Sequence, residues 1–129
     1  MGSVRAAVVT MIENKLAEAV RQVADFAVAH PNARIAIVAA GFDLIRKRVL
    51  PEFDRLDAVL RPSQTNSRRM LVVWANKAEA LCYSAEWPET LRGHEPYDLV
   101  WVYEYGLSAE AKARASRLSR DGMLITSSG

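Results

Sequence analysis

The segment that most limits the fold of this chain is Arg34 to Ala40, which reads RIAIVAA and is apolar after its first residue. A strand that is apolar at every position, instead of every second one, is typical of a parallel sheet covered on both faces. Gly41 ends the run. Parallel strands need long crossover connections, which are usually helices. The segment therefore predicts a sheet whose strands alternate with helices.

Three other apolar runs have the length of strands: Val4–Thr10, Tyr97–Tyr103 and Met123–Thr126. We expect these runs and residues 34–40 to form parallel strands at the centre of the sheet. Asn14–His30 carries apolar residues three and four positions apart, which predicts a helix with one apolar face.

Two more segments have helical patterns, and a third predicts a hairpin. Phe42–Leu60 is expected to be helical with a break or kink near Pro51, and Ser108 is expected to cap a helix that ends near residue 119. Residues 61–67 read as a polar loop. Arg69–Trp74 and Ala78–Ser84 predict a β-hairpin at an edge or over the end of the sheet. The fold class is therefore α/β, a three-layer sandwich with a mostly parallel sheet plus a β-hairpin.

Composition excludes several classes of protein. The chain has 129 residues, which fits one domain, and its net charge of +2 is too even to indicate nucleic-acid binding by itself. The single cysteine, Cys82, lies in an apolar run, so we expect a packed thiol, and with two histidines it makes a zinc site improbable. We expect no metal site, no membrane span and no signal peptide, which places the protein in the cytoplasm.

The most distinctive segment is Tyr83–Tyr105, YSAEWPETLRGHEPYDLVWVYEY, a polar loop that leads into an apolar strand and ends near an acid. It resembles the large terminase subunits of tailed phages, the motors that package DNA. Those proteins carry Ser-Ala, Glu, Pro and Leu-Arg-Gly in this order, then an apolar strand and an Asp-Glu pair. The resemblance implies a P-loop NTPase type of fold, with residues 1–129 as a single truncated domain like the front portion of the terminase ATPase domain.

In that family the Asp of the pair holds magnesium and the Glu polarises the attacking water. Here the pair reads Tyr103-Glu104, so the metal-side Asp is missing. Glu104 is the candidate general base. The alternative is a carboxylate at a strand end that pairs with an arginine.

The phosphate-binding loop of the family is also altered. Such a loop needs glycines that let backbone N–H groups approach the phosphates, followed by Lys and a hydroxyl residue. Between the first strand and the first helix this chain has no glycine, Leu16 replaces the hydroxyl, and Glu13 adds negative charge. Lys15 falls where the phosphate-binding lysine is expected, as the remnant of such a loop or as a solvated residue of the first helical turn.

Arg92 stands in Leu91-Arg92-Gly93, the part of the pattern that is intact. The resemblance makes it a candidate for an arginine that reaches the nucleotide of a neighbouring subunit. The alternative is a loop arginine paired with a nearby glutamate. Basic groups at residues 46–48, 68–69 and 114–120 are candidates for contacts with DNA phosphates, or form solvated faces.

These residues predict a catalytically degenerate terminase-like domain, which acts as a binding or regulatory module in phage-type DNA packaging with terminase or portal components as partners. No cofactor is expected. One alternative is an active ATPase with an atypical phosphate loop, which requires ATP and magnesium. Another is a small interaction protein that reuses the fold. Trp87 lies in a polar loop where no core position is expected, and we predict a homo-oligomer, most simply a dimer, that uses it. The alternative is that Trp87 folds back onto the edge of the sheet.

Overall fold

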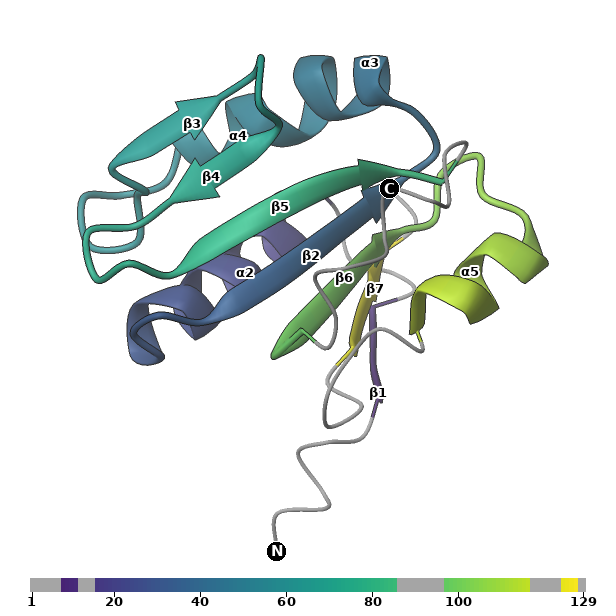
Figure 1. Ribbon diagram of the computed structural model, residues 1–129, viewed down its shortest axis with the longest axis horizontal. Coiled ribbons are helices and arrows are strands. Elements are labelled where there is room, and N and C mark those ends of the chain that lie inside the picture. The colour runs from purple at the N-terminus through teal and green to yellow at the C-terminus, as the bar shows by residue number, and fades with distance from the viewer. Residues whose placement is uncertain (1–7, 12–15, 86–96, 117–123, 128–129) are drawn as a thin grey trace, which may run out of the picture.

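The chain forms both strands and helices in the computed structural model, which describes residues 8–11, 16–85, 97–116 and 124–127 (Figure 1). The elements in chain order are β1 Val8–Met11, α2 Leu16–Ala29, β2 Arg34–Ala39, α3 Phe42–Leu44, the π-helical turn η1 Ile45–Val49, α4 Leu50–Asp54, β3 Gln64–Asn66, β4 Leu71–Val73, β5 Glu79–Ser84, β6 Leu99–Tyr103, α5 Ala109–Ser116 and β7 Leu124–Ser127. The predicted α/β class is confirmed.

The strands of the described residues form one seven-stranded sheet in the order β1-β7-β6-β2-β5-β4-β3. In this order, the four pairings that link β1, β7, β6, β2 and β5 are parallel. Strand β4 pairs antiparallel with both β5 and β3. The sheet is thus mixed, and the expectation of a mostly parallel sheet is corrected. The reason is that a short turn can join only antiparallel strands, so the hairpin adds one antiparallel pairing, β4 with β5, and β3 adds a second by pairing with β4.

Two strands lie elsewhere in the sheet than predicted. The hairpin is present, but β5 is an inner strand paired with β2, with Ala80 and Cys82 buried, so only β4 and β3 lie towards the edge. Conversely, β1 was expected at the centre and is the outer strand of the described sheet, because the last strand, β7, inserts between β1 and β6. Both corrections concern long-range pairing, which local apolar patterns do not specify.

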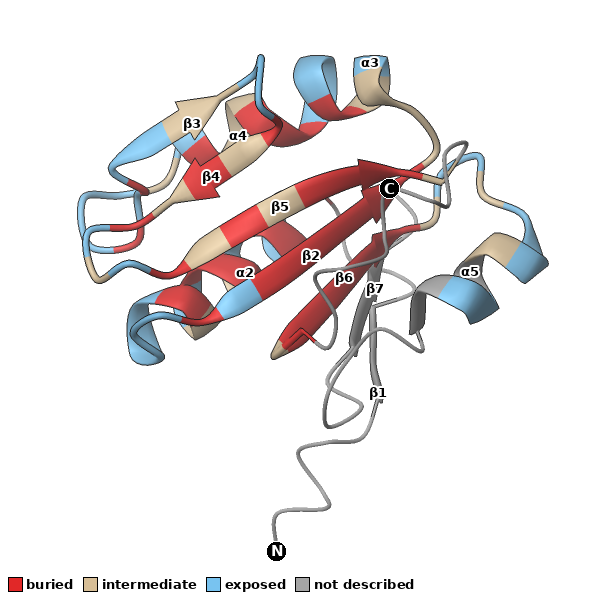
Figure 2. Cartoon of the chain, viewed as in Figure 1, coloured by how far each residue is buried: buried red, intermediate tan, exposed pale blue. Residues whose placement is uncertain are grey.

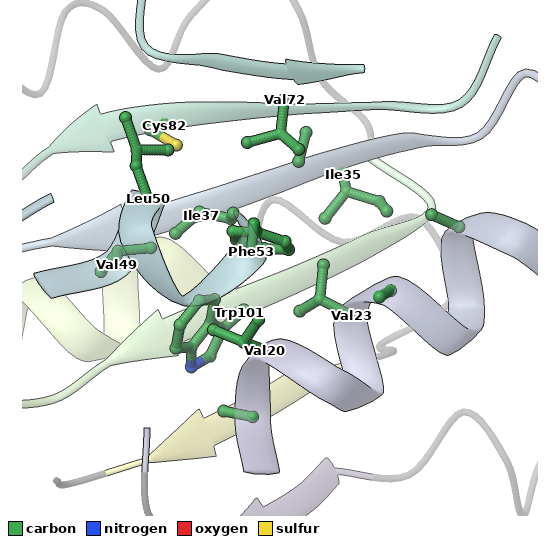
Figure 3. Close-up of a cluster of buried hydrophobic side chains, with 14 of the residues drawn as sticks. Val20, Val23, Ile35, Ile37, Val49, Leu50, Phe53, Val72, Cys82 and Trp101 are labelled. Carbon is green, nitrogen blue, oxygen red and sulfur yellow. The ribbon is translucent and has the colours of Figure 1, made fainter. Parts of the chain in front are cut away.

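The main core lies between the sheet and the helices on one of its faces. Val20 and Val23 of α2 point toward Trp101 of β6, while Phe53 of α4 packs near Ile37 of β2 (Figure 3). All five side chains are fully buried. The inner strands β2 and β6 are buried along nearly their whole length (Figure 2).

The opposite face of the sheet carries a second, smaller cluster. It includes Tyr83 of β5, Tyr97, and Val100 of β6, and Leu107 packs against it just before α5 begins. The strands β2, β5 and β6 are therefore covered on both faces, as the unbroken apolar pattern of residues 34–40 predicts.

The second helical segment is shorter than expected. It was predicted to reach Leu60, but α4 ends at Asp54. Asp57 Oδ1 accepts hydrogen bonds from the backbone N–H groups of Val59 (3.1 Å) and Leu60 (3.2 Å), which forms a turn in place of further helix. The helix does not break at Pro51: helical residues continue from the π-helical turn η1 through Pro51 into α4, and Pro51 lies in the first turn of α4, where its missing N–H costs little.

Strand β3 occupies part of the segment predicted to be a polar loop. Its neighbour Ser63 donates its backbone N–H to the carbonyl of Val73 (2.8 Å), and the hydroxyl of Thr65 donates to Asp54 of α4 (3.0 Å). Three polar residues at a sheet edge have no apolar alternation, so the sequence held no strand signal here.

Candidate functional site at the carboxyl edge of the sheet

The parallel strands all end at one edge of the sheet, which we call the carboxyl edge. Ligands of open α/β sheets bind in the crevice outside this edge. Met11 at the end of β1 pairs in register with Ser127 of β7, and Ser127 pairs with Tyr103 of β6. Neighbouring strands are about 4.8 Å apart, so the ends of β1 and β6 are separated by roughly 10 Å.

Of the three residues predicted for the site, the structure describes one. This residue is Glu104, which directly follows the end of β6 at the carboxyl edge. Lys15 and Arg92 lie outside the described residues, as does Trp87. What the structure gives for Lys15 is only its chain neighbourhood, because β1 ends at Met11 on this edge and α2 begins at Leu16. The roles of Lys15 and Arg92 stay predictions.

Glu104 begins a tight turn. Its carbonyl oxygen accepts a hydrogen bond from the backbone N–H of Leu107 (2.9 Å), and Gly106 in the same turn has φ of +79°. Glycine adopts this conformation without steric cost. Glu104 itself is half-buried. The turn thereby fixes the backbone of Glu104 and Tyr105 directly outside the end of β6.

Tyr103 is fully buried, with its side chain in the main core. Its ring stacks on that of Tyr105 with centroids 6.2 Å apart, and lies 6.0 Å from that of Trp101. Burial raises the pKa of Tyr103, and the positive charge of Arg48 opposes that rise. A neutral phenol in an apolar setting is a poor ligand for magnesium, which prefers carboxylate oxygens. Within the described part of the chain, there is no cluster of three or more Asp, Glu, His or Cys side chains that could hold a metal ion.

The sequence reasoning missed the contact between Arg48 and Tyr105. The guanidinium carbon of Arg48 in η1 lies 5.4 Å from the ring centroid of Tyr105, in a cation–π arrangement. In the sequence, Arg48 belongs to the basic run at residues 46–48, a candidate for contacts with DNA phosphates. One signal was available: Trp101, Tyr103 and Tyr105 alternate along β6 and just beyond it, which predicts three rings on one side of the strand.

Ser84 and Ala85, in the distinctive segment, have structural roles. Ser84 ends β5 and is fully buried, with its hydroxyl 3.4 Å from the carbonyl oxygen of Ala40, and the N–H of Ala85 donates to Ala39 (2.8 Å). These bonds hold the ends of β5 and β2 together.

Cys82 is a buried free thiol whose pKa is raised by burial to about 12, which confirms the prediction of a packed thiol.

No protein-family model matches the sequence, and no curated protein matches it. Among solved structures, the large terminase from a thermophilic bacteriophage, in complex with ADP, superimposes on 97% of this chain with a TM-score of 0.69 and 11% identity. The fold is terminase-like. At this identity the similarity concerns the fold alone, and the chain spans 34% of the length of that terminase. No helix of the terminase-like fold, as far as it is described, is long and apolar enough to cross a membrane.

Proposed function

We propose that this terminase-like domain does not hydrolyse nucleotides and serves as a binding or regulatory module in phage-type DNA packaging. The observation that supports the proposal is the fully buried, neutral Tyr103 beside Glu104. Phosphoryl transfer to water depends on a magnesium ion that neutralises charge developing on the phosphate oxygens. Tyr103 supplies no carboxylate for that ion.

The second support is the absence of glycine between β1 and α2 in the sequence. Without glycine, backbone N–H groups cannot approach a phosphate chain closely. In this proposal Lys15 is a remnant, Glu104 no longer acts as a general base, and no cofactor is held. Arg92 is offered to a partner, such as a terminase or portal component, and the domain works in the cytoplasm of the host cell.

A phosphate-release assay with ATP and magnesium tests the loss of hydrolysis. We expect no release above the background of a heat-denatured sample, and identical traces for the wild type, Lys15→Ala and Glu104→Gln. Turnover by the wild type that falls on either substitution would instead establish the alternative of an active ATPase with an atypical phosphate loop.

The link to packaging has its own test. We expect Arg92→Ala to weaken co-purification with a large terminase or portal protein from the native host, because a truncated side chain no longer carries the guanidinium. If the wild type recovers neither component, the domain is a small interaction protein that reuses the fold, which is the remaining alternative.

A further inference from the structure

The carboxyl edge contains a buried hydroxyl group without a hydrogen-bond partner. The Tyr103 hydroxyl is inaccessible to solvent and has no partner in the structure as described. Buried polar groups in proteins nearly always have partners, and each exception needs an explanation. A ligand that accepts a hydrogen bond from this hydroxyl would supply one.

A cation lies over the ring that stacks on Tyr103. Arg48 is exposed and lies over the exposed ring of Tyr105, which in turn stacks on Tyr103. Among the described residues no ion pair joins Arg48 to a carboxylate, whereas Arg46, two positions earlier, pairs with Asp43 at 2.8 Å. The planar guanidinium, with its five donors, matches the geometry of a phosphate group.

The backbone explains how Arg48 comes to lie there. Arg48 belongs to the π-helical turn η1, in which the N–H of Leu50 donates to the carbonyl of Ile45, five residues earlier. Such turns are rare and frequently occur at functional sites, because the wider turn changes the direction of the following side chains. Here it leaves Arg48 above the end of β6.

The groups around Arg48 are hydroxyls and a positive charge. The rings of Tyr103 and Tyr105 stack on each other, and the guanidinium of Arg48 lies over the ring of Tyr105. Phenol groups and a guanidinium donate hydrogen bonds, which favours an anion over a metal ion.

We propose that Arg48, Tyr103 and Tyr105 form a site for a phosphate group that does not require magnesium. The inference rests on the proposed loss of hydrolysis at this edge, and it names the ligand class. Arg48 donates to the phosphate oxygens, and the Tyr103 hydroxyl gains the acceptor that it lacks. Access requires the exposed side chains of Arg48 and Tyr105 to change rotamer, which exposed side chains do within nanoseconds.

Titration calorimetry in EDTA with inorganic phosphate tests the site. We expect binding that Arg48→Gln weakens by about tenfold or more, since a charge-assisted hydrogen bond is lost, and that Tyr103→Phe weakens by about fivefold. Arg46→Gln removes the same charge two residues away and is the matched control, with unchanged affinity. Thermal unfolding of each variant verifies that it folds.

ADP and a short single-stranded oligonucleotide, both in EDTA, identify the source of the phosphate group. Tighter binding of either one than of free phosphate, with the same dependence on Arg48, supports the site and names its ligand. No binding of any of the three, binding only with magnesium, or equal loss in Arg46→Gln overturns it. Phosphate release from ATP would contradict the proposed function, whereas absent binding without hydrolysis contradicts only this site.

Discussion

The hydroxyl groups of Tyr83 and Tyr97 lie 2.5 Å apart in the buried layer on the second face of the sheet. Their rings meet edge to face, with centroids 6.1 Å apart, and the guanidinium of Arg34 lies 5.8 Å from the Tyr97 ring. Burial raises the pKa of Tyr83, so its hydroxyl remains protonated at neutral pH. The pair joins the end of β5 to the residues that lead into β6.

Tyr83→Phe should lower the free energy of unfolding by about 1 kcal/mol, because a buried hydrogen bond is lost while the ring remains. The double variant with Tyr97→Phe should be less destabilised than the sum of the two single variants, since replacing both partners is close to neutral. Urea denaturation of the four proteins measures this. Strictly additive losses would mean that the two hydroxyls do not stabilise each other.

Tyr103→Phe provides the contrast. It removes a buried hydroxyl that has no partner in the described structure, so it should leave the free energy of unfolding unchanged or raise it. The change from Tyr to Phe at positions 83 and 103 thus compares the loss of a buried hydroxyl that has a hydrogen-bond partner with the loss of one that has none in the described structure. A loss of about 1 kcal/mol or more in this variant would show that Tyr103 has a structural partner.

The inner strands β2 and β6 were predictable from the sequence because both faces of each are buried. Residues 34–40 and 97–103 are apolar almost throughout, so no other placement buries them. The edge strand β3 was not predictable, because Gln64–Asn66 is short and polar and forms only through pairing with β4. A strand that buries apolar side chains can be predicted from its own residues, whereas the formation of a polar edge strand depends on the strand with which it pairs.

The candidate site divides in the same way. Glu104 was predicted at the carboxyl edge because it follows an apolar parallel strand, and it lies there. The contact between Arg48 and Tyr105 was not predictable, since the two residues are distant in the chain and meet through the π-helical turn. A helix with a regular pattern would direct Arg48 elsewhere, and no sequence rule marks where a single turn widens.

Gly106→Ala should destabilise the protein by about 1 kcal/mol, because φ of +79° is unfavourable for alanine. The added Cβ would lie 3.5 Å from the Cβ of Ala40, which is an ordinary contact. Urea denaturation gives the loss. Because the turn also fixes Glu104 and Tyr105, backbone amide chemical shifts of these residues should move as well. An unchanged midpoint would mean that the turn relaxes to a negative φ.

Cys82 makes stability depend on pH at the alkaline end. Its pKa is raised from 9.0 to about 12 in the folded protein because the buried thiol loses the solvation that a thiolate requires. The folded state therefore binds the proton more tightly, so this contribution is complete below about pH 9 and is lost as the pH rises towards 12.

The measurement is urea denaturation between about pH 8 and about pH 10.5, where the slope from this thiol approaches about 1.4 kcal/mol per pH unit. Cys82→Ala is the control, because it removes the titrating group and should flatten the profile above about pH 9 relative to the wild type. Thiol reagents should modify Cys82 only after unfolding. Rapid modification of the folded protein at about pH 8 would contradict the buried thiol.

The last prediction concerns assembly, and it depends on Trp87 in a polar segment of the sequence, Glu86-Trp87-Pro88-Glu89. Large aromatic side chains are enriched at protein interfaces, and two-fold dimers are the commonest assemblies of soluble proteins. Light scattering at tens of micromolar should give about twice the 14.3 kDa mass of the chain. Trp87→Ala should shift the mass towards the monomer while circular dichroism stays unchanged, and Trp74→Phe, within the core, should leave the mass as it is. A wild-type mass of 14.3 kDa at every concentration would refute the dimer.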